Sequence, residues 1–264
     1  MKKLLVIFAF SSIFFSACED DQAVPVETSG KTTLRFDAVF GTQDFALNTN
    51  FVSGSKTYNF TKFRYWISDV SLINSKGEEV KVPESYYLLE ETGEINLRGV
   101  NNDLATTVYP ATKREDVVLD DIVPGDYKTI KFSVGVDQKY NDNLSLQAGE
   151  LSQLNGMTNV SWMWLTSYIF TSLGGTVSEG GVSKTMKVET GLNTNYKQVL
   201  LDLPQPLHIS SDKTTTILLN ADISKITDGV DIVATPTVGA SQAAVMSAVA
   251  TNYATKVFTV KSVN

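Results

Sequence analysis

Residues 62–72 read KFRYWISDVSL, and this stretch decides the class of fold. Apolar Phe63 and Tyr65 alternate with polar neighbours, which is the period-two pattern of a β-strand with one buried face. After Ile67 the pattern slips by one residue, so that Val70 continues the apolar face. A slip of this kind inside a strand indicates a β-bulge. The stretch therefore predicts a bulged strand in a half-buried sheet.

The same alternation recurs along the chain and predicts further strands over 34–40, 117–122, 127–136, 199–203 and 214–219. Turn residues predict a hairpin that joins 70–73 to 80–82, and a turn at Pro124-Gly125-Asp126. Residues 101–113 and 174–183 read as loops. An Ala-rich stretch predicts one helix over 241–255, capped by Ser241. The predicted fold is all-β: an antiparallel β-sandwich over 32–264, with long loops and a short C-terminal helix.

The first 17 residues have the pattern of a secretory leader. Two lysines precede an apolar run over 4–15, which is too short to span a bilayer as a helix. The small residues Ser16 and Ala17 then precede Cys18, the one cysteine of the chain. This arrangement predicts cleavage before Cys18 and attachment of a lipid to its thiol. An ordinary secretory signal followed by a chance cysteine is the alternative.

Cleavage would remove two lysines and no acidic residue, which changes the formal net charge from −7 to −9. An acidic chain disfavours nucleic acid as a partner. Residues 18–31 are polar and acidic and predict a flexible tether. Their acidic start resembles the export signal of Bacteroidetes lipoproteins, although a plain solvated linker would read the same way. We therefore expect a lipid-anchored protein of the outer membrane that faces the periplasm or the cell surface.

The most unusual stretch is 156–170, GMTNVSWMWLTSYIF. On a strand, Trp162 and Trp164 point to one face and Met163 to the other. The simpler interpretation is a buried central strand. The functional interpretation is an aromatic platform, joined by Trp66, that stacks on a sugar ring or shields a soft metal ion.

Together with 62–72, 124–137 and 252–260, this stretch resembles the MbnP-like family, named for a periplasmic copper protein associated with methanobactin. The resemblance runs from about Thr32 to the C-terminus. Its most specific parts are the Gly-Val-Asp strand end at 135–137 and the Trp-x-Trp strand. It implies a secreted β-sandwich, and its characterised members bind copper through histidines and an oxidised tryptophan, kynurenine.

The chain departs from that family at the histidines. Lys187 stands where many relatives have a histidine after the Trp-x-Trp strand, and Ala38 stands where they often have one near the start. Neither residue offers a lone pair at neutral pH. The one histidine is His208, and a surface histidine is the simpler interpretation. A residual copper(I) site of His208 with Met163, Met186 or Trp162 is the alternative.

A second candidate metal site consists of Asp137, Asn141 and Asp142, which follow a predicted strand. Ca²⁺ prefers such carboxylate and amide oxygens, but the spacing matches no EF-hand. An Asx-rich turn is the simpler interpretation.

Signals for catalysis are weak. The chain contains neither a Gly-x-Ser-x-Gly nor a His-Glu-x-x-His motif. With one histidine and no free thiol, a Ser-His-Asp set that spares His208 and a Cys-His set are excluded, whereas paired carboxylates for glycoside hydrolysis are not. We therefore expect a non-enzymatic lipoprotein. Three hypotheses stay open: a copper-handling protein that has lost most of its histidines, a surface module that binds a glycan or a protein, and a structural subunit of an outer-membrane complex.

Overall fold

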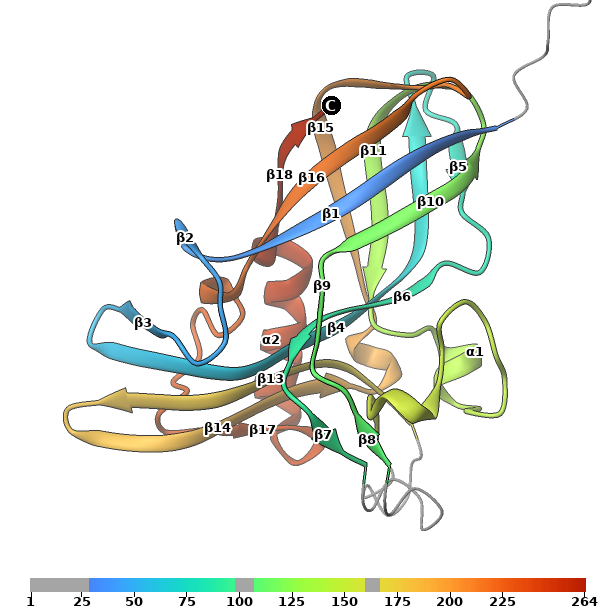
Figure 1. Ribbon diagram of the computed structural model, residues 1–264. Coiled ribbons are helices and arrows are strands. Elements are labelled where there is room, and N and C mark those ends of the chain that lie inside the picture. The colour runs from blue at the N-terminus through green and yellow to red at the C-terminus, as the bar shows by residue number, and fades with distance from the viewer. Residues whose placement is uncertain (1–28, 98–106, 160–166) are drawn as a thin grey trace, which may run out of the picture.

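Two β-sheets face each other in the computed structural model, which describes residues 29–97, 107–159 and 167–264 (Figure 1). The smaller sheet contains β1 (Gly30–Phe40), β2 (Gln43–Asp44), β10 (Asp116–Ile122), β16 (Thr214–Asp222) and β18 (Phe258–Val263). The larger sheet contains β3 (Asn50–Ser53), β4 (Lys56–Asn74), β5 (Glu79–Lys81), β6 (Tyr86–Thr92), β9 (Thr112–Arg114), β11 (Gly125–Val134), β12 (Thr158–Asn159), β13 (Ser167–Glu179), β14 (Val182–Gly191), β15 (Lys197–Ile209) and β17 (Thr237–Val238). A separate short ladder joins β7 (Ile95–Asn96) to β8 (Val108–Tyr109).

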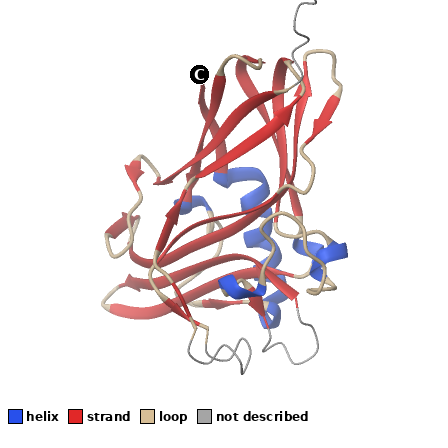
Figure 2. Ribbon diagram, turned by 45° about the vertical axis from the view of Figure 1, so that its right-hand side comes forward, coloured by secondary structure: helices blue, strands red, loops and turns tan. Residues whose placement is uncertain are grey.

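Helices are short, as Figure 2 shows. They are α1 (Gln138–Asn141), α2 (Ala243–Asn252), a π-turn over Tyr253–Val257 and single 3₁₀ turns at Gln153–Asn155, Asn193–Asn195, Ile223–Lys225 and Ala240–Gln242. None of the helices in the described ranges has the length and apolar character needed to cross a membrane.

β4 organises the larger sheet, because it pairs with β3, β5, β6, β11 and β13. Its predicted bulge is confirmed. Between the ladder pairs Ser71 with Lys131 and Ser68 with Ser133, β4 has one residue more than β11. The bulge holds Asp69, whose φ of 50° lies in the left-handed region.

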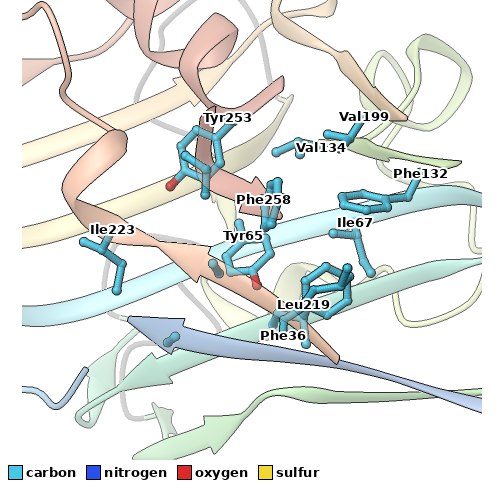
Figure 3. Packing of buried hydrophobic residues seen from close by; sticks show 14 of the residues in the cluster. Phe36, Tyr65, Ile67, Phe132, Val134, Val199, Leu219, Ile223, Tyr253 and Phe258 are labelled. Carbon is cyan, nitrogen blue, oxygen red and sulfur yellow. The ribbon is translucent and has the colours of Figure 1, made fainter. Parts of the chain in front are cut away.

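The central core lies between the sheets and is built around aromatic rings (Figure 3). Phe36 of β1 meets Phe132 of β11 edge to face at 5.5 Å and Phe258 of β18 at 5.8 Å between ring centroids. Phe63 and Tyr65 join this core from β4. The alternation that predicted these strands thus places one side of each strand between the sheets, which confirms a β-sandwich.

The expectation of purely antiparallel pairing is wrong at two places. β1 runs parallel to β16, with Leu34 opposite Ile217, and β14 runs parallel to β17. Strands so distant in sequence are not joined by a hairpin, so no short turn imposes their relative direction.

The expected loop at 174–183 is also wrong, because these residues form the ends of β13 and β14 and the turn between them. Gly180 and Gly181 have φ of 57° and 81°, which a two-residue hairpin turn requires. Gly175 sits against β4, where a Cβ would lie 2.1 Å from the carbonyl oxygen of Asn59. These glycines therefore serve a tight hairpin and a close strand contact. Of the loop expected over 101–113, residues 101–106 lie outside the described residues, and the remainder contains the short strands β8 and most of β9.

The predicted C-terminal helix is present, but its boundaries and cap differ. α2 begins at Ala243 after the 3₁₀ turn, and no side chain caps its first amide groups, so Ser241 is not the cap. Its buried face contains Met246, Val249 and Ala250, and it packs against β14.

Candidate functional site

Of the predicted tryptophan platform the structure describes only Trp66, because Trp162, Met163 and Trp164 lie outside the described residues. The side chain of Trp66 is fully buried, and its ring meets Tyr168 edge to face at 6.0 Å. It belongs to a second apolar cluster on the face of β4 that points away from the central core. Trp66 therefore offers no surface to a ligand, which corrects its predicted binding role.

A row of polar side chains crosses five strands on that same face of β4. In ladder order the row contains Arg114 of β9, Glu90 of β6, Arg64 of β4, Ser172 of β13 and Glu189 of β14. Each member lies directly opposite the next, so that side chains of adjacent strands are within contact range. We call these five residues the charged row.

The centre of the charged row is a buried ion pair. Arg64 Nε donates to Glu90 Oε2 at 2.7 Å, and the two side chains are only 1% and 3% exposed. The guanidinium also donates to the carbonyl oxygen of Asn155 at 2.8 Å and lies 4.8 Å from the ring centroid of Tyr109. The Tyr109 hydroxyl donates to the other Glu90 oxygen. Both charges are thus fully compensated, which a buried pair requires.

The far end of the charged row holds a second carboxylate between two lysines. Glu189 is 6% exposed at its side chain and accepts a hydrogen bond from Ser172 Oγ at 3.1 Å. Lys187 Nζ lies 3.0 Å and Lys62 Nζ lies 3.9 Å from its two oxygens. Burial lowers the pKa of Lys62, the nearby Lys187 lowers it further, and Glu189 opposes both effects. The cluster therefore places two cations around one buried acid, whose charge is fully compensated.

The two positions at which the family resemblance implies histidines, 38 and 187, do not face each other. Ala38 lies in the central core. Lys187 lies between Met186 and Val188, which both point into that core, so Lys187 points to the opposite face of the sheet. An imidazole at position 38 of β1 would therefore lie between the two sheets, whereas one at position 187 of β14 would lie on the outer face of the larger sheet.

The residual copper site predicted from His208 and Met186 is contradicted by their placement. Met186 is buried and pairs with Gly175, which in turn lies opposite Phe60 on β4. His208 lies beyond the other end of β4, next to the ladder pair of Tyr127 with Asn74. At about 3.3 Å per residue, roughly 40 Å of strand separates these two positions.

His208 is a surface residue, as the simpler interpretation predicted. Its side chain is 70% exposed, and Nδ1 lies 2.8 Å from Asp126 Oδ1 across the β11–β15 ladder. No group of three or more His, Cys, Asp or Glu side chains that could hold a metal occurs among the described residues.

The predicted calcium ligands are engaged in other bonds around α1. Asp137 caps the helix by accepting from the Lys139 backbone amide at 3.0 Å, and it also accepts from the Tyr86 hydroxyl. Asn141 Oδ1 accepts from the Tyr168 backbone amide at 2.9 Å, and Asp142 Oδ1 accepts from Asn193 Nδ2 at 2.8 Å. These oxygens hold the turn together, as the simpler interpretation of an Asx-rich turn predicts.

A hollow of about 400 Å³ opens beside this turn. Its wall contains three tyrosines, three acidic residues and one lysine: Tyr86, Tyr140, Tyr196, Asp69, Glu84, Asp137 and Lys139. Tyr86 and Tyr140 meet edge to face at 5.1 Å between centroids, and Tyr196 contacts Ser68 through its hydroxyl at 3.1 Å. We call this space the tyrosine hollow.

The phenols of Tyr86 and Tyr196 stay protonated over a wide pH range. Burial raises the pKa of Tyr86, and its hydrogen bond to the Asp137 carboxylate raises it further. Burial also raises the pKa of Tyr196. The hollow therefore combines aromatic rings with carboxylates, a combination that can bind a ring or a cation.

Sequence reasoning missed the tyrosine hollow and the charged row. Tyr140 lies inside the polar cluster 137–143, which was the one local signal. Tyr86 and Tyr196 lie in separate parts of the chain, and neither belongs to a motif. The burial of Glu90 could not be predicted, because the sequence does not show that Arg64 lies opposite it.

Comparison with known proteins yields one family and one solved structure. MbnP from Methylosinus trichosporium is similar to this chain with a TM-score of 0.46 and 16% sequence identity, over 76% of this chain and 78% of that one. No curated protein matches the sequence. A family model described as MbnP matches residues 29–247, which is most of the chain. The protein therefore belongs to the MbnP family, as its sequence motifs predict.

Proposed function

We propose that this protein is a non-enzymatic binding protein, held outside the cytoplasm by a lipid on Cys18, and that it does not use a histidine-based copper site. Lys187 is the observation that carries the proposal. It occupies the position at which the resemblance implies an imidazole, and its ammonium is paired with the buried Glu189. A cation at this position offers no lone pair and repels a copper ion.

The other described residues support the same function. His208 is tied to Asp126 on the surface, away from Met186. The carboxylates of the charged row are compensated by basic side chains, so neither is free to act as a general base or a metal ligand. The leader and its single cysteine support export and attachment to the outer membrane.

Copper titration of the purified mature protein tests the metal part of this proposal. We expect no binding of Cu(I) or Cu(II) tighter than about micromolar when a competing chelator sets the free metal concentration. Sub-micromolar binding would contradict the proposal and favour copper handling. The variant His208→Ala then shows whether the surface histidine supplies the site.

Membrane attachment is tested separately. Mass spectrometry of the amino-terminal peptide should find a lipid on Cys18, and the variant Cys18→Ala should lose the lipid and leave the membrane fraction. An unprocessed amino terminus would contradict this part of the proposal and leave the copper result untouched.

A further inference from the structure

The tyrosine hollow contains aromatic surface that the described core does not use. Tyr86 and Tyr140 are half-buried, and they pack against the second apolar cluster while bordering the hollow. Aromatic rings presented in this way bind either the apolar face of a sugar or a cation.

The charges of the hollow discriminate between these two ligands. Asp69 and Glu84 form no ion pair with any other described residue, whereas Asp137 is occupied by the Tyr86 hydroxyl and the Lys139 amide. Three acids and one lysine give the hollow a net charge of −2. Two uncompensated carboxylates attract a cation and bring no charge complementarity to a neutral sugar.

The chain itself already places an ammonium group in the hollow. Lys139 Nζ lies 4.6 Å from the ring centroid of Tyr140 and 3.1 Å from its hydroxyl oxygen. The hydrogen bond to Tyr140 is the main cause of the raised pKa of Lys139, and the negative charge of Glu84 also raises it. The hollow therefore stabilises an alkylammonium group held by a surface side chain.

We propose that the tyrosine hollow is a binding site for an organic ammonium group, such as an alkylamine or a quaternary amine, which would displace the Lys139 ammonium from Tyr140. The ring of Tyr140 provides the cation–π contact, and Asp69 and Glu84 provide the opposite charge. The inference rests on the proposed binding function and names its ligand class.

The direct test is a titration of the mature protein with tetramethylammonium, in which the NMR signals of the tyrosines report binding. We expect saturable binding with a dissociation constant on the order of millimolar, as suits a ligand of five heavy atoms. tert-Butanol has nearly the same shape without the charge and serves as the matched neutral probe. Glucose tests the sugar alternative. Both neutral compounds should fail to saturate.

Four variants assign the binding to the hollow. Tyr140→Ala should weaken tetramethylammonium binding about tenfold, whereas Tyr140→Phe keeps the ring and should retain it. Asp69→Asn combined with Glu84→Gln should weaken it about tenfold, with a smaller dependence on salt. Lys139→Met removes the competing ammonium and should tighten binding several-fold.

Asp44→Asn is the control for the loss of charge, because Asp44 is an exposed acid on β2 and does not line the hollow. The inference is overturned if tetramethylammonium does not saturate, if tert-butanol or glucose binds equally well, or if the Tyr140→Ala and Asp69/Glu84 variants bind as the unmodified protein does. These results do not depend on the copper and lipid measurements, so either proposal can fail alone.

Discussion

The two faces of β4 differ in the kind of contact that they make, although they are formed by alternate residues of one strand. On one face Phe63 and Tyr65 pack against the smaller sheet in a core of aromatic rings. On the other face Arg64 and Trp66 meet a polar row and a smaller apolar cluster. The first face gains stability from water exclusion over a large area. On the second face each buried charge is paired with a particular partner, so this face specifies which strands and loops lie beside β4.

The largest effect should come from the core face. Phe36→Ala should lower the free energy of unfolding by about 4 kcal/mol, because it removes a ring that contacts both sheets and leaves a cavity. Urea unfolding measures the loss. Val52→Ala is the matched control, since Val52 is 67% exposed and should change stability by less than about 0.5 kcal/mol. Equal losses of stability in the two variants would contradict the claim that the aromatic core stabilises the fold.

The next largest effect should come from the charged face. Glu90→Gln leaves Arg64 as a buried, uncompensated cation and should cost about 3 kcal/mol in urea unfolding. The double variant Arg64→Met/Glu90→Leu removes both charges and should recover much of that loss. A double variant as unstable as Glu90→Gln would show that the pair contributes stability of its own, beyond specifying the arrangement of strands.

Stability measured at a series of alkaline pH values tests the contribution of the core face of β4. Burial raises the pKa of Tyr65 and Tyr253 in the folded protein. Their neutral forms therefore contribute stability that is fully present below the unfolded pKa of about 10 and is lost as pH rises toward the folded value. We expect a loss of about 1.4 kcal/mol per pH unit for each tyrosine above pH 10 or so.

Stability at each pH is read from circular dichroism in urea, and tyrosinate absorbance reports ionisation. The variant Tyr65→Phe/Tyr253→Phe should flatten the alkaline limb. An alkaline limb as steep in this variant as in the unmodified protein would assign the loss to other groups.

The smallest effect should come from Lys187, the exposed cation that pairs with Glu189 at the end of the charged row. Lys187 is 57% exposed at its side chain, and Lys62 remains beside Glu189 when Lys187 is replaced. Lys187→Gln should therefore cost no more than about 0.5 kcal/mol, and less at high salt. A cost of several kcal/mol that persists at high salt would show that Lys187 is essential to the row.

Several features of the fold could be read from neighbouring residues alone. The slip after Ile67 predicted the bulge at Asp69, and the Ala-rich stretch predicted α2. Both depend on periodicity within a few residues, which the backbone geometry of strands and helices imposes locally. The glycines at 180 and 181 were equally local signals of a hairpin, but their Gly-rich surroundings were read as a loop.

By itself, then, the sequence determined the β-sandwich class, the family and the shortage of histidines, because composition and alternation are properties of the chain before it folds. Tertiary structure alone decided that β1 runs parallel to β16 and that Glu90 faces Arg64. It alone placed Trp66 in a core and gathered Tyr86, Tyr140 and Tyr196 around one hollow. Strand partners are chosen by the packing of surfaces distant in sequence, and no local pattern records that choice.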